Sequence, residues 1–227
     1  DRGAAGGGRA APTVHPMTRA PWVTLAIAGA ALVVAGVPGL GDHLALELGD
    51  PWQPWRWWAS HLGHFSWNHL GWDVLVLLVL GAALEREDRR GAALLYALAP
   101  PVVALGAAAL APSVGTYRGL SGLDSALAGA VIVSTWRSAR DARGRWTAGL
   151  LAAAALAKIS FELATGDTVF ARAEGWVPVP VAHGIGGLVG ACLWAWAVGP
   201  RIEVSHDGPL PSSRVAVARP GLRSAGV

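Results

Sequence analysis

Gly119-Leu120-Ser121-Gly122 begins a long hydrophobic segment, residues 119–136, and places a serine in its first turn. A later hydrophobic segment, residues 178–199, carries His183 at a similar depth from its own start. A serine hydroxyl is a weak nucleophile that needs a base within hydrogen-bond reach, and neutral imidazole commonly serves. The pattern therefore predicts Ser121 as nucleophile and His183 as base, provided that both helices begin at the same end of the fold.

The hydrophobic residues of the chain come in long blocks that short charged stretches separate. Hydrophobic residues make up 53% of the sequence and charged residues only 15%. A helix needs about 20 mainly apolar residues to cross a bilayer. Six blocks approach this length, at residues 22–40, 67–84, 91–111, 119–136, 147–165 and 178–199. The sequence therefore predicts an all-α membrane protein with six transmembrane helices.

The two ends of the chain lack such blocks. Residues 1–20 are rich in Gly and Ala without the apolar run of a signal peptide, and residues 200–227 are rich in Pro and Ser. We expect a flexible arm at 1–20, one six-span domain at 21–199 and a flexible tail at 200–227. The only cysteine, Cys192, lies within the last block, which excludes a disulfide framework. The arginines form no single basic patch, so no nucleic-acid partner is expected.

The placement of arginine predicts the orientation of the spans. Most arginines lie in the first 20 residues, after the second and fourth blocks, and in the tail. The alternate connections carry only Arg56, Arg118 and Arg172, together with several acidic residues. Cytoplasmic loops of membrane proteins are enriched in Lys and Arg. Both termini are therefore predicted to be cytoplasmic, which places Ser121 and His183 in the outer third of the membrane.

The same orientation places a third group of polar residues near the outer face. His69 and His64 lie at the start of the second block, and Asp73 lies one turn further in. The first backbone N–H groups of a helix have no intrahelical partner, so those beside Ser121 are free to hold an oxyanion. The glycines on either side of the Leu120-Ser121 pair allow the backbone to approach a substrate closely.

Three histidines of the first loop and second block raise the alternative of a metal site. His61, His64 and His69 lack an H-E-x-x-H pattern and have no carboxylates at ligand spacing. We therefore expect no metal and no organic cofactor.

Further polar residues lie inside the hydrophobic blocks. Lys158 and Glu162 stand four residues apart, and either charge alone near the bilayer centre would cost about 2.5–3.5 kcal/mol. We interpret them as a structural pair on one helix face, with a functional role as the alternative. Asp124, one turn past Ser121, is interpreted as structural, either in a polar network or paired with Arg118.

The ordered motifs of the chain resemble those of one known family. They are Trp55-Arg56, His64-Phe65-Ser66-Trp67-Asn68-His69-Leu70, Gly81-Ala82-Ala83-Leu84-Glu85, Gly119-Leu120-Ser121-Gly122 and Ala182-His183. Over residues 55–199 this set is similar to the rhomboid family of intramembrane serine proteases. The resemblance implies a six-helix rhomboid-like bundle, a Ser121–His183 dyad, and oxyanion contacts from His69 and the backbone of Ser121. Supporting roles fall to the neighbouring residues Gly119, Leu120, Gly122, Asp73 and His64.

One position departs from the pattern of many rhomboids, which have asparagine where this chain has Asp73. An ionised Asp73 would repel a developing oxyanion, so it must be protonated, turned away or paired elsewhere. Aspartate at 73, the stretch from Arg118 to Leu127, and the later Lys158 and Glu162 are similar to the rhombosortase subgroup. Its members are thought to process bacterial surface proteins with a C-terminal Gly-Gly sorting tail, which implies a bacterial inner-membrane location.

The sequence therefore predicts an intramembrane serine endopeptidase, a rhombosortase, that cleaves a single-span membrane protein within the lipid bilayer near the outer face. A rhomboid protease with other substrates is the nearest alternative. A non-catalytic rhomboid-like protein that binds membrane helices is a second alternative, although both Ser121 and His183 are present. A transporter would show inverted repeats, and the sequence shows none.

Overall fold

The computed structural model describes residues 20–171 and 177–198. Apart from Ala20, the predicted arm and tail lie outside the described residues, as does Arg172. The described elements follow in order: α1 (Trp22–Gly36), α2 (Leu40–Leu44), β1 (Leu46–Glu47), α3 (Arg56–Ala59), η1 (Ser60–Leu62), α4 (Trp67–Val76), η2 (Leu77–Gly81), α5 (Ala82–Glu87), α6 (Arg89–Leu110), η3 (Pro112–Val114), β2 (Thr116–Tyr117), α7 (Ser121–Ser138), α8 (Ala142–Thr165) and α9 (Pro180–Ala197).

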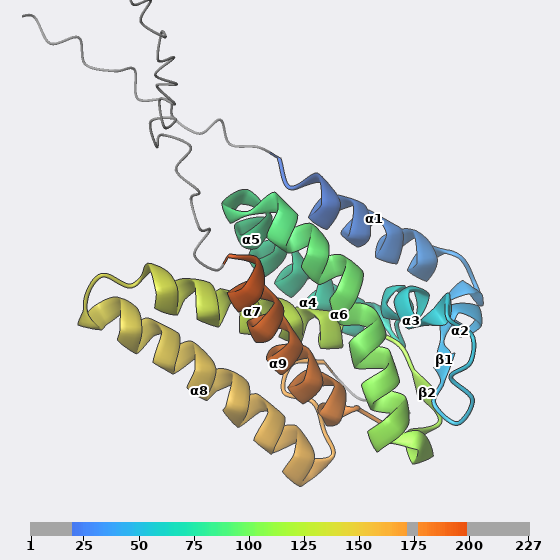
Figure 1. The fold of residues 1–227 in the computed structure, drawn as a ribbon. Helices are drawn as coiled ribbons and strands as arrows, with labels where there is room; N and C mark the ends of the chain where they lie inside the picture. The colour runs from blue at the N-terminus through green and yellow to red at the C-terminus, as the bar shows by residue number, and fades with distance from the viewer. Residues whose placement is uncertain (1–19, 172–176, 199–227) are drawn as a thin grey trace, which may run out of the picture.

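The long helices form one bundle in which α7 is flanked by α8 and α9 (Figure 1). The α5–α6 junction, the α7–α8 junction and the end of α9 lie at one end of this bundle. Hydrogen bonds agree, since Arg137 Nη1 donates to Ala195 O over 2.9 Å and Ser134 Oγ donates to Glu87 Oε2 over 2.6 Å. At the other end, α7 and α9 both begin, as the prediction for Ser121 and His183 requires.

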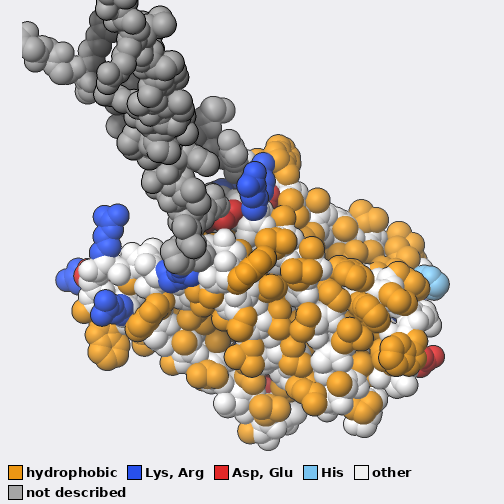
Figure 2. All heavy atoms as spheres, in the orientation of Figure 1, with side chains coloured by type: hydrophobic (Ala, Val, Ile, Leu, Met, Phe, Trp, Pro, Cys, Tyr) orange, Lys and Arg blue, Asp and Glu red, His pale blue; other side chains and the backbone are white. Residues whose placement is uncertain are grey.

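The chain is a multi-pass membrane protein. Four described helices are long and apolar enough to cross a bilayer, namely Trp67–Glu87, Arg89–Leu110, Ala142–Thr165 and Pro180–Ala197. Figure 2 shows a surface dominated by hydrophobic side chains, with the blue Lys and Arg side chains gathered toward one end of the described part. The count of six spans stays a prediction.

The ends of several helices differ from the predicted blocks for local reasons. The first helix ends at Gly36 instead of residue 40, because Pro38 disfavours helical backbone just before it. The fifth block begins earlier than predicted, at Ala142, because the Asp141 side chain caps the helix by accepting from Gly144 N at 2.9 Å.

A buried carboxylate fastens α1 to the bundle. Glu85, only 3% exposed, accepts hydrogen bonds from the backbone N–H groups of Val23 (3.1 Å) and Thr24 (2.9 Å) at the start of α1. These N–H groups have no acceptor within their own helix, and the carboxylate supplies one where the helix dipole favours negative charge. The glutamate of the Gly81–Glu85 motif is therefore a helix-docking residue.

Two prolines inside α6 connect it to the loop before α4. Pro101 has no N–H, so the carbonyl of Ala97 loses its intrahelical donor, and Trp58 Nε1 donates to it over 2.8 Å. His61, 2% exposed, places its Nε2 3.1 Å from the carbonyl of Pro100. Burial lowers the pKa of His61 to about 4. His61 is therefore directed at the backbone of α6 and away from the set of three histidines that the metal alternative requires.

Helices α7 and α9 approach so closely that their contact surfaces need glycine. A Cβ atom at Gly190 would lie 1.8 Å from Ala126 O, and one at Gly186 would lie 2.1 Å from Gly122 O. By contrast, Gly184 has nothing within 4 Å of its Cβ position. Small residues at such an interface let helix backbones pack directly, which fixes the separation of Ser121 from His183.

Candidate active site

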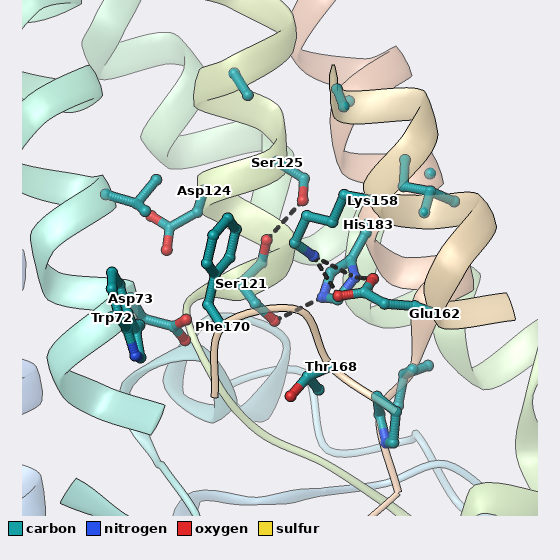
Figure 3. Close-up of a pocket in the computed structure, with 18 of the residues that line it drawn as sticks. Trp72, Asp73, Ser121, Asp124, Ser125, Lys158, Glu162, Thr168, Phe170 and His183 are labelled. Carbon is teal, nitrogen blue, oxygen red and sulfur yellow. Dashed lines mark hydrogen bonds and ion pairs between the residues drawn. The ribbon is translucent and has the colours of Figure 1, made fainter. Parts of the chain in front are cut away.

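The structure brings the side chains of Ser121 and His183 into contact. Ser121 Oγ lies 3.0 Å from His183 Nε2, within hydrogen-bond range (Figure 3). Ser121 is the first residue of α7, and His183 lies in the first turn of α9, so the close packing of these helices sets the distance. His183 is 5% exposed. This geometry allows the imidazole to remove the hydroxyl proton.

The turn before Ser121 depends on Gly119. Its φ of 127° lies in the region that only glycine adopts readily, and a Cβ atom there would lie 2.9 Å from His69 Cε1. The Gly119 N–H donates to Ser60 O over 3.1 Å, which ties the turn to the loop before α4. The glycine therefore lets the chain pass beside the His69 ring and enter α7 with the serine directed at His183.

A carboxylate touches the other nitrogen of the His183 ring. Glu162 Oε2 lies 2.6 Å from His183 Nδ1, and Glu162 Oε1 accepts from Lys158 Nζ over 2.6 Å. Lys158 Nζ also lies 3.2 Å from His183 Nδ1. Lys158 and Glu162 contact each other as the sequence predicts, and both also contact His183.

Asp73 contacts two imidazoles beside the reactive pair, in the same cleft. Its Oδ2 lies 3.2 Å from His64 Nε2 and 3.3 Å from His69 Nε2. Of the three possibilities that the sequence leaves for Asp73, the structure places it in pairing with other groups. His69 is held in place at the start of α4, where its backbone N–H donates to the Ser66 side chain over 3.1 Å.

Backbone N–H groups converge on the start of α7. The Leu120 N–H donates to His64 Nε2 over 3.4 Å. Of the predicted supporting residues, Leu120 therefore has its N–H group already directed at a histidine and not at the cleft. The Ser121 N–H begins the helix and has no intrahelical acceptor, while the next N–H group, of Gly122, donates to the Tyr117 hydroxyl. An oxygen that develops negative charge beside Ser121 can therefore meet the Ser121 N–H at the positive end of the helix.

Asp124 and Arg118 do not pair with each other. Arg118 forms an ion pair with Asp42 and lies over the Phe65 ring, with its guanidinium carbon 4.1 Å from the ring centre. Asp124 is 6% exposed, and its Oδ1 has no hydrogen-bond partner among the described residues. The alternative in which Arg118 neutralises Asp124 is therefore wrong.

A cleft of about 660 Å³ contains the reactive pair and extends between α4, α7, α8 and α9 (Figure 3). Most of its lining is apolar, while Ser121, His183, Glu162 and Asp124 contribute polar groups. Among the lining residues, the rings of Trp72 and Phe170 are 5.5 Å apart between centres. The cleft therefore offers an apolar surface for a chain segment next to a small polar centre. Within residues 20–171 and 177–198, no group of three or more His, Cys, Asp or Glu is arranged to hold a metal ion.

The contact of Glu162 with His183 was missed from the sequence, although a signal for it exists. Glu162 stands three residues before the end of block 147–165, at the same end of the bundle as Ser121 and His183. The depth of the ion pair along its hydrophobic block matches the depth of His183 along the last block, and this match is the signal that predicts their proximity.

Comparison with known proteins assigns the chain to a family. A family comparison matches residues 51–201 to the Rhomboid domain. No curated protein matches the chain significantly. Rhomboid proteins are generally intramembrane serine proteases, and the family also includes inactive members. Because the match covers more than half of the chain and includes every motif from Trp55 to His183, the chain belongs to the rhomboid family.

Proposed function

We propose that this protein is an active intramembrane serine endopeptidase with Ser121 as nucleophile and His183 as general base and acid. The observation that carries the proposal is the 3.0 Å contact between Ser121 Oγ and His183 Nε2 inside the apolar cleft. An inactive rhomboid-like binder would have no need of this contact.

The reaction follows from the positions of the groups. Ser121 Oγ attacks the scissile carbonyl carbon while its proton passes to His183 Nε2, which gives a tetrahedral intermediate. The backbone N–H group of Ser121 stabilises the oxyanion, with His69 beside it. His183 then returns the proton to the leaving amine as the C–N bond breaks. Water, deprotonated by the same imidazole, hydrolyses the acyl-enzyme and releases the new carboxylate.

The substrate class follows from the cleft and from the charge of the bundle ends. The apolar lining contributed by α4, α7 and α8 suits a hydrophobic segment of a single-span membrane protein. The arginine-bearing junctions lie at the end of the bundle opposite to Ser121. By the positive-inside rule, cleavage would occur near the outer face of the membrane, with both termini cytoplasmic. The resemblance to the rhombosortase subgroup implies that this membrane is the bacterial inner membrane.

The rhombosortase assignment refines this substrate class to proteins that carry a C-terminal Gly-Gly sorting tail. Its support is the sequence resemblance at Arg118–Leu127, at Asp73, and at Lys158 and Glu162. A direct test offers the purified protein two reporters with the same membrane helix and basic tail, one with the Gly-Gly pair and one without it. Preferential cleavage of the first supports the refinement, and equal cleavage favours a rhomboid protease of other specificity.

Labelling with a fluorophosphonate probe tests the catalytic proposal itself. The purified protein in bilayer vesicles should label at Ser121, and Ser121→Ala and His183→Ala should both abolish the signal. Ser138→Ala is the matched control, because Ser138 is exposed at the far end of the same helix. A wild-type protein that is folded but neither labels nor cleaves a membrane reporter would refute the proposal and leave the helix-binding alternative.

A further inference from the structure

Two charged residues of helix α8, Lys158 and Glu162, meet His183 of α9. Within α8, only Ala148 and Glu162 are buried. The Glu162 side chain is 1% exposed, and the Lys158 side chain is 29% exposed. Placing a carboxylate in such an apolar location costs free energy unless hydrogen bonds satisfy it. Here one oxygen meets Lys158 and the other meets His183, so the buried charge has a defined partner at the reactive pair.

The chemistry of the ring decides what this contact does. To take a proton from Ser121 at Nε2, a neutral imidazole must carry its own proton on Nδ1. That Nδ1–H group needs an acceptor, and Glu162 Oε2 lies 2.6 Å away. A carboxylate in this position holds the ring in the reactive tautomer and stabilises the imidazolium that forms during the reaction.

Lys158 acts on the same nitrogen in the opposite sense. An ammonium group only donates hydrogen bonds, so its contact with Nδ1 at 3.2 Å favours the tautomer in which Nδ1 has no proton. Its positive charge also disfavours an imidazolium. The same ammonium group binds Glu162 at 2.6 Å and so holds the carboxylate in place. Its positive charge also offsets part of the stabilisation that the carboxylate gives to the imidazolium.

We propose that Glu162 is a positioning residue that holds His183 in its reactive tautomer, with Lys158 as an opposing group that orients the carboxylate. The proposal rests on the proposed protease function and extends the Ser121–His183 pair to a third helix. The other ionisable side chains that line the cleft are His69, Asp73, Tyr117, Arg118 and Asp124. The contacts at His183 Nδ1 come from the two residues of α8, at 3.2 Å from Lys158 Nζ and 2.6 Å from Glu162 Oε2, so these two charges act most directly on that nitrogen.

The pH profile of fluorophosphonate labelling tests this proposal. The labelling rate rises with pH as His183 loses its proton. Replacing Glu162 with glutamine removes the charge that stabilises the imidazolium, so the midpoint of this rise should move to lower pH. Replacing Lys158 with methionine removes the opposing charge, so the midpoint should move to higher pH. Each shift should be at least about half a pH unit, and Glu162→Gln should also lower the maximal rate by at least about 100-fold.

Opposite shifts separate positioning from a purely structural role. If the two residues only fasten α8, both substitutions break the same pair and should lower thermal stability while the midpoint stays in place. Asp167→Asn is the matched charge control, because Asp167 is exposed five residues beyond Glu162 and should leave the midpoint unchanged. Glu162→Asp keeps the negative charge that Glu162→Gln removes. It should therefore restore the midpoint of the pH profile more fully than it restores the maximal labelling rate. If Glu162→Gln does not fold, Glu162→Asp and Lys158→Met still decide the direction.

A measurement of the tautomer separates this proposal from the catalytic one. Nitrogen-15 NMR of ring-labelled protein, with His183→Gln for assignment, reports which nitrogen of His183 carries the proton. The expected result is Nδ1–H in the wild type and Nε2–H in Glu162→Gln. If the wild type never labels, the protease proposal fails and the tautomer measurement alone decides the role of Glu162. The proposal is overturned if Glu162→Gln leaves the tautomer unchanged, or if folded Glu162 and Lys158 variants shift the midpoint in the same direction or not at all.

Discussion

Alanine at Gly190 should separate the two helices that carry the reactive pair. Its Cβ atom would lie 1.8 Å from Ala126 O, whereas ordinary contact begins at about 3.4 Å, so α7 and α9 must part by about 1.6 Å. Such overpacking costs about 1–3 kcal/mol. A shift of this size would carry the 3.0 Å contact between Ser121 and His183 beyond hydrogen-bond range. Because a misplacement of about 1 Å can cost about 100-fold, labelling should slow by that order.

A graded alanine series along α9 gives this prediction its control. The Cβ position of Gly184 is open, that of Gly187 is 3.8 Å from Ser125 O, and those of Gly186 and Gly190 overlap backbone atoms. The thermal unfolding temperature and the rate of fluorophosphonate labelling should therefore fall in that order. The melting temperature should drop by about 2–12 °C at the last two sites. If Gly190→Ala melts and labels like Gly187→Ala, close approach of the helices does not set the active geometry.

Two further predictions concern the turn before α7 and the loop before α4. Gly119→Ala should lower both stability and labelling, because a Cβ atom there would meet an imidazole at 2.9 Å, whereas Gly115→Ala, also at positive φ but with nothing within 4 Å, should lower stability alone. Burial lowers the pKa of His61 from 6.5 to about 4, so as the pH falls the unfolded state takes up a proton before the folded state does. The free energy of unfolding should therefore decrease by about 3 kcal/mol between pH 6.5 and pH 4. Unfolding in detergent at several pH values should show this decline weakened in His61→Gln and unchanged in His43→Gln, because His43 is exposed; an equal decline in both variants would contradict it.

The hydrophobic blocks allowed most of the helical architecture to be predicted. All six predicted blocks coincide with helices, because long apolar runs are stable in a bilayer only with satisfied backbone groups. Helix ends were less accurate, since they depend on local caps such as Asp141 that the hydrophobic pattern does not include. The depth of Ser121 and His183 could be counted from the block starts, so their common end of the bundle was predictable. The extra contacts of the site were not.

Asp73 shows the first kind of contact that hydrophobic blocks cannot reveal. His69 lies one turn before Asp73 on α4, at i,i+4 spacing, but the contact with His64 requires the loop before α4 to fold back over the helix start. Gly119 controls this geometry, since its N–H group binds Ser60 and its empty Cβ position leaves room for the ring of His69. The i,i+4 spacing in the sequence identifies His69 as one partner of Asp73, but only the three-dimensional path of the loop identifies His64 as the second.

Glu162 shows the second kind, and the physical reason gives a criterion for reading such pairs. A carboxylate has two oxygens, and a lysine four residues earlier on the same helix satisfies one of them. In water the second oxygen would be hydrated, but in an apolar segment it needs another donor. A pair such as Lys158 and Glu162 inside a predicted span therefore implies a third group at the same depth on a neighbouring helix. Ser121 and His183 lie at that depth. When His183 Nε2 accepts from the Ser121 hydroxyl, the Nδ1–H group of the same ring is still free to donate. The second oxygen of Glu162 therefore points to His183 Nδ1.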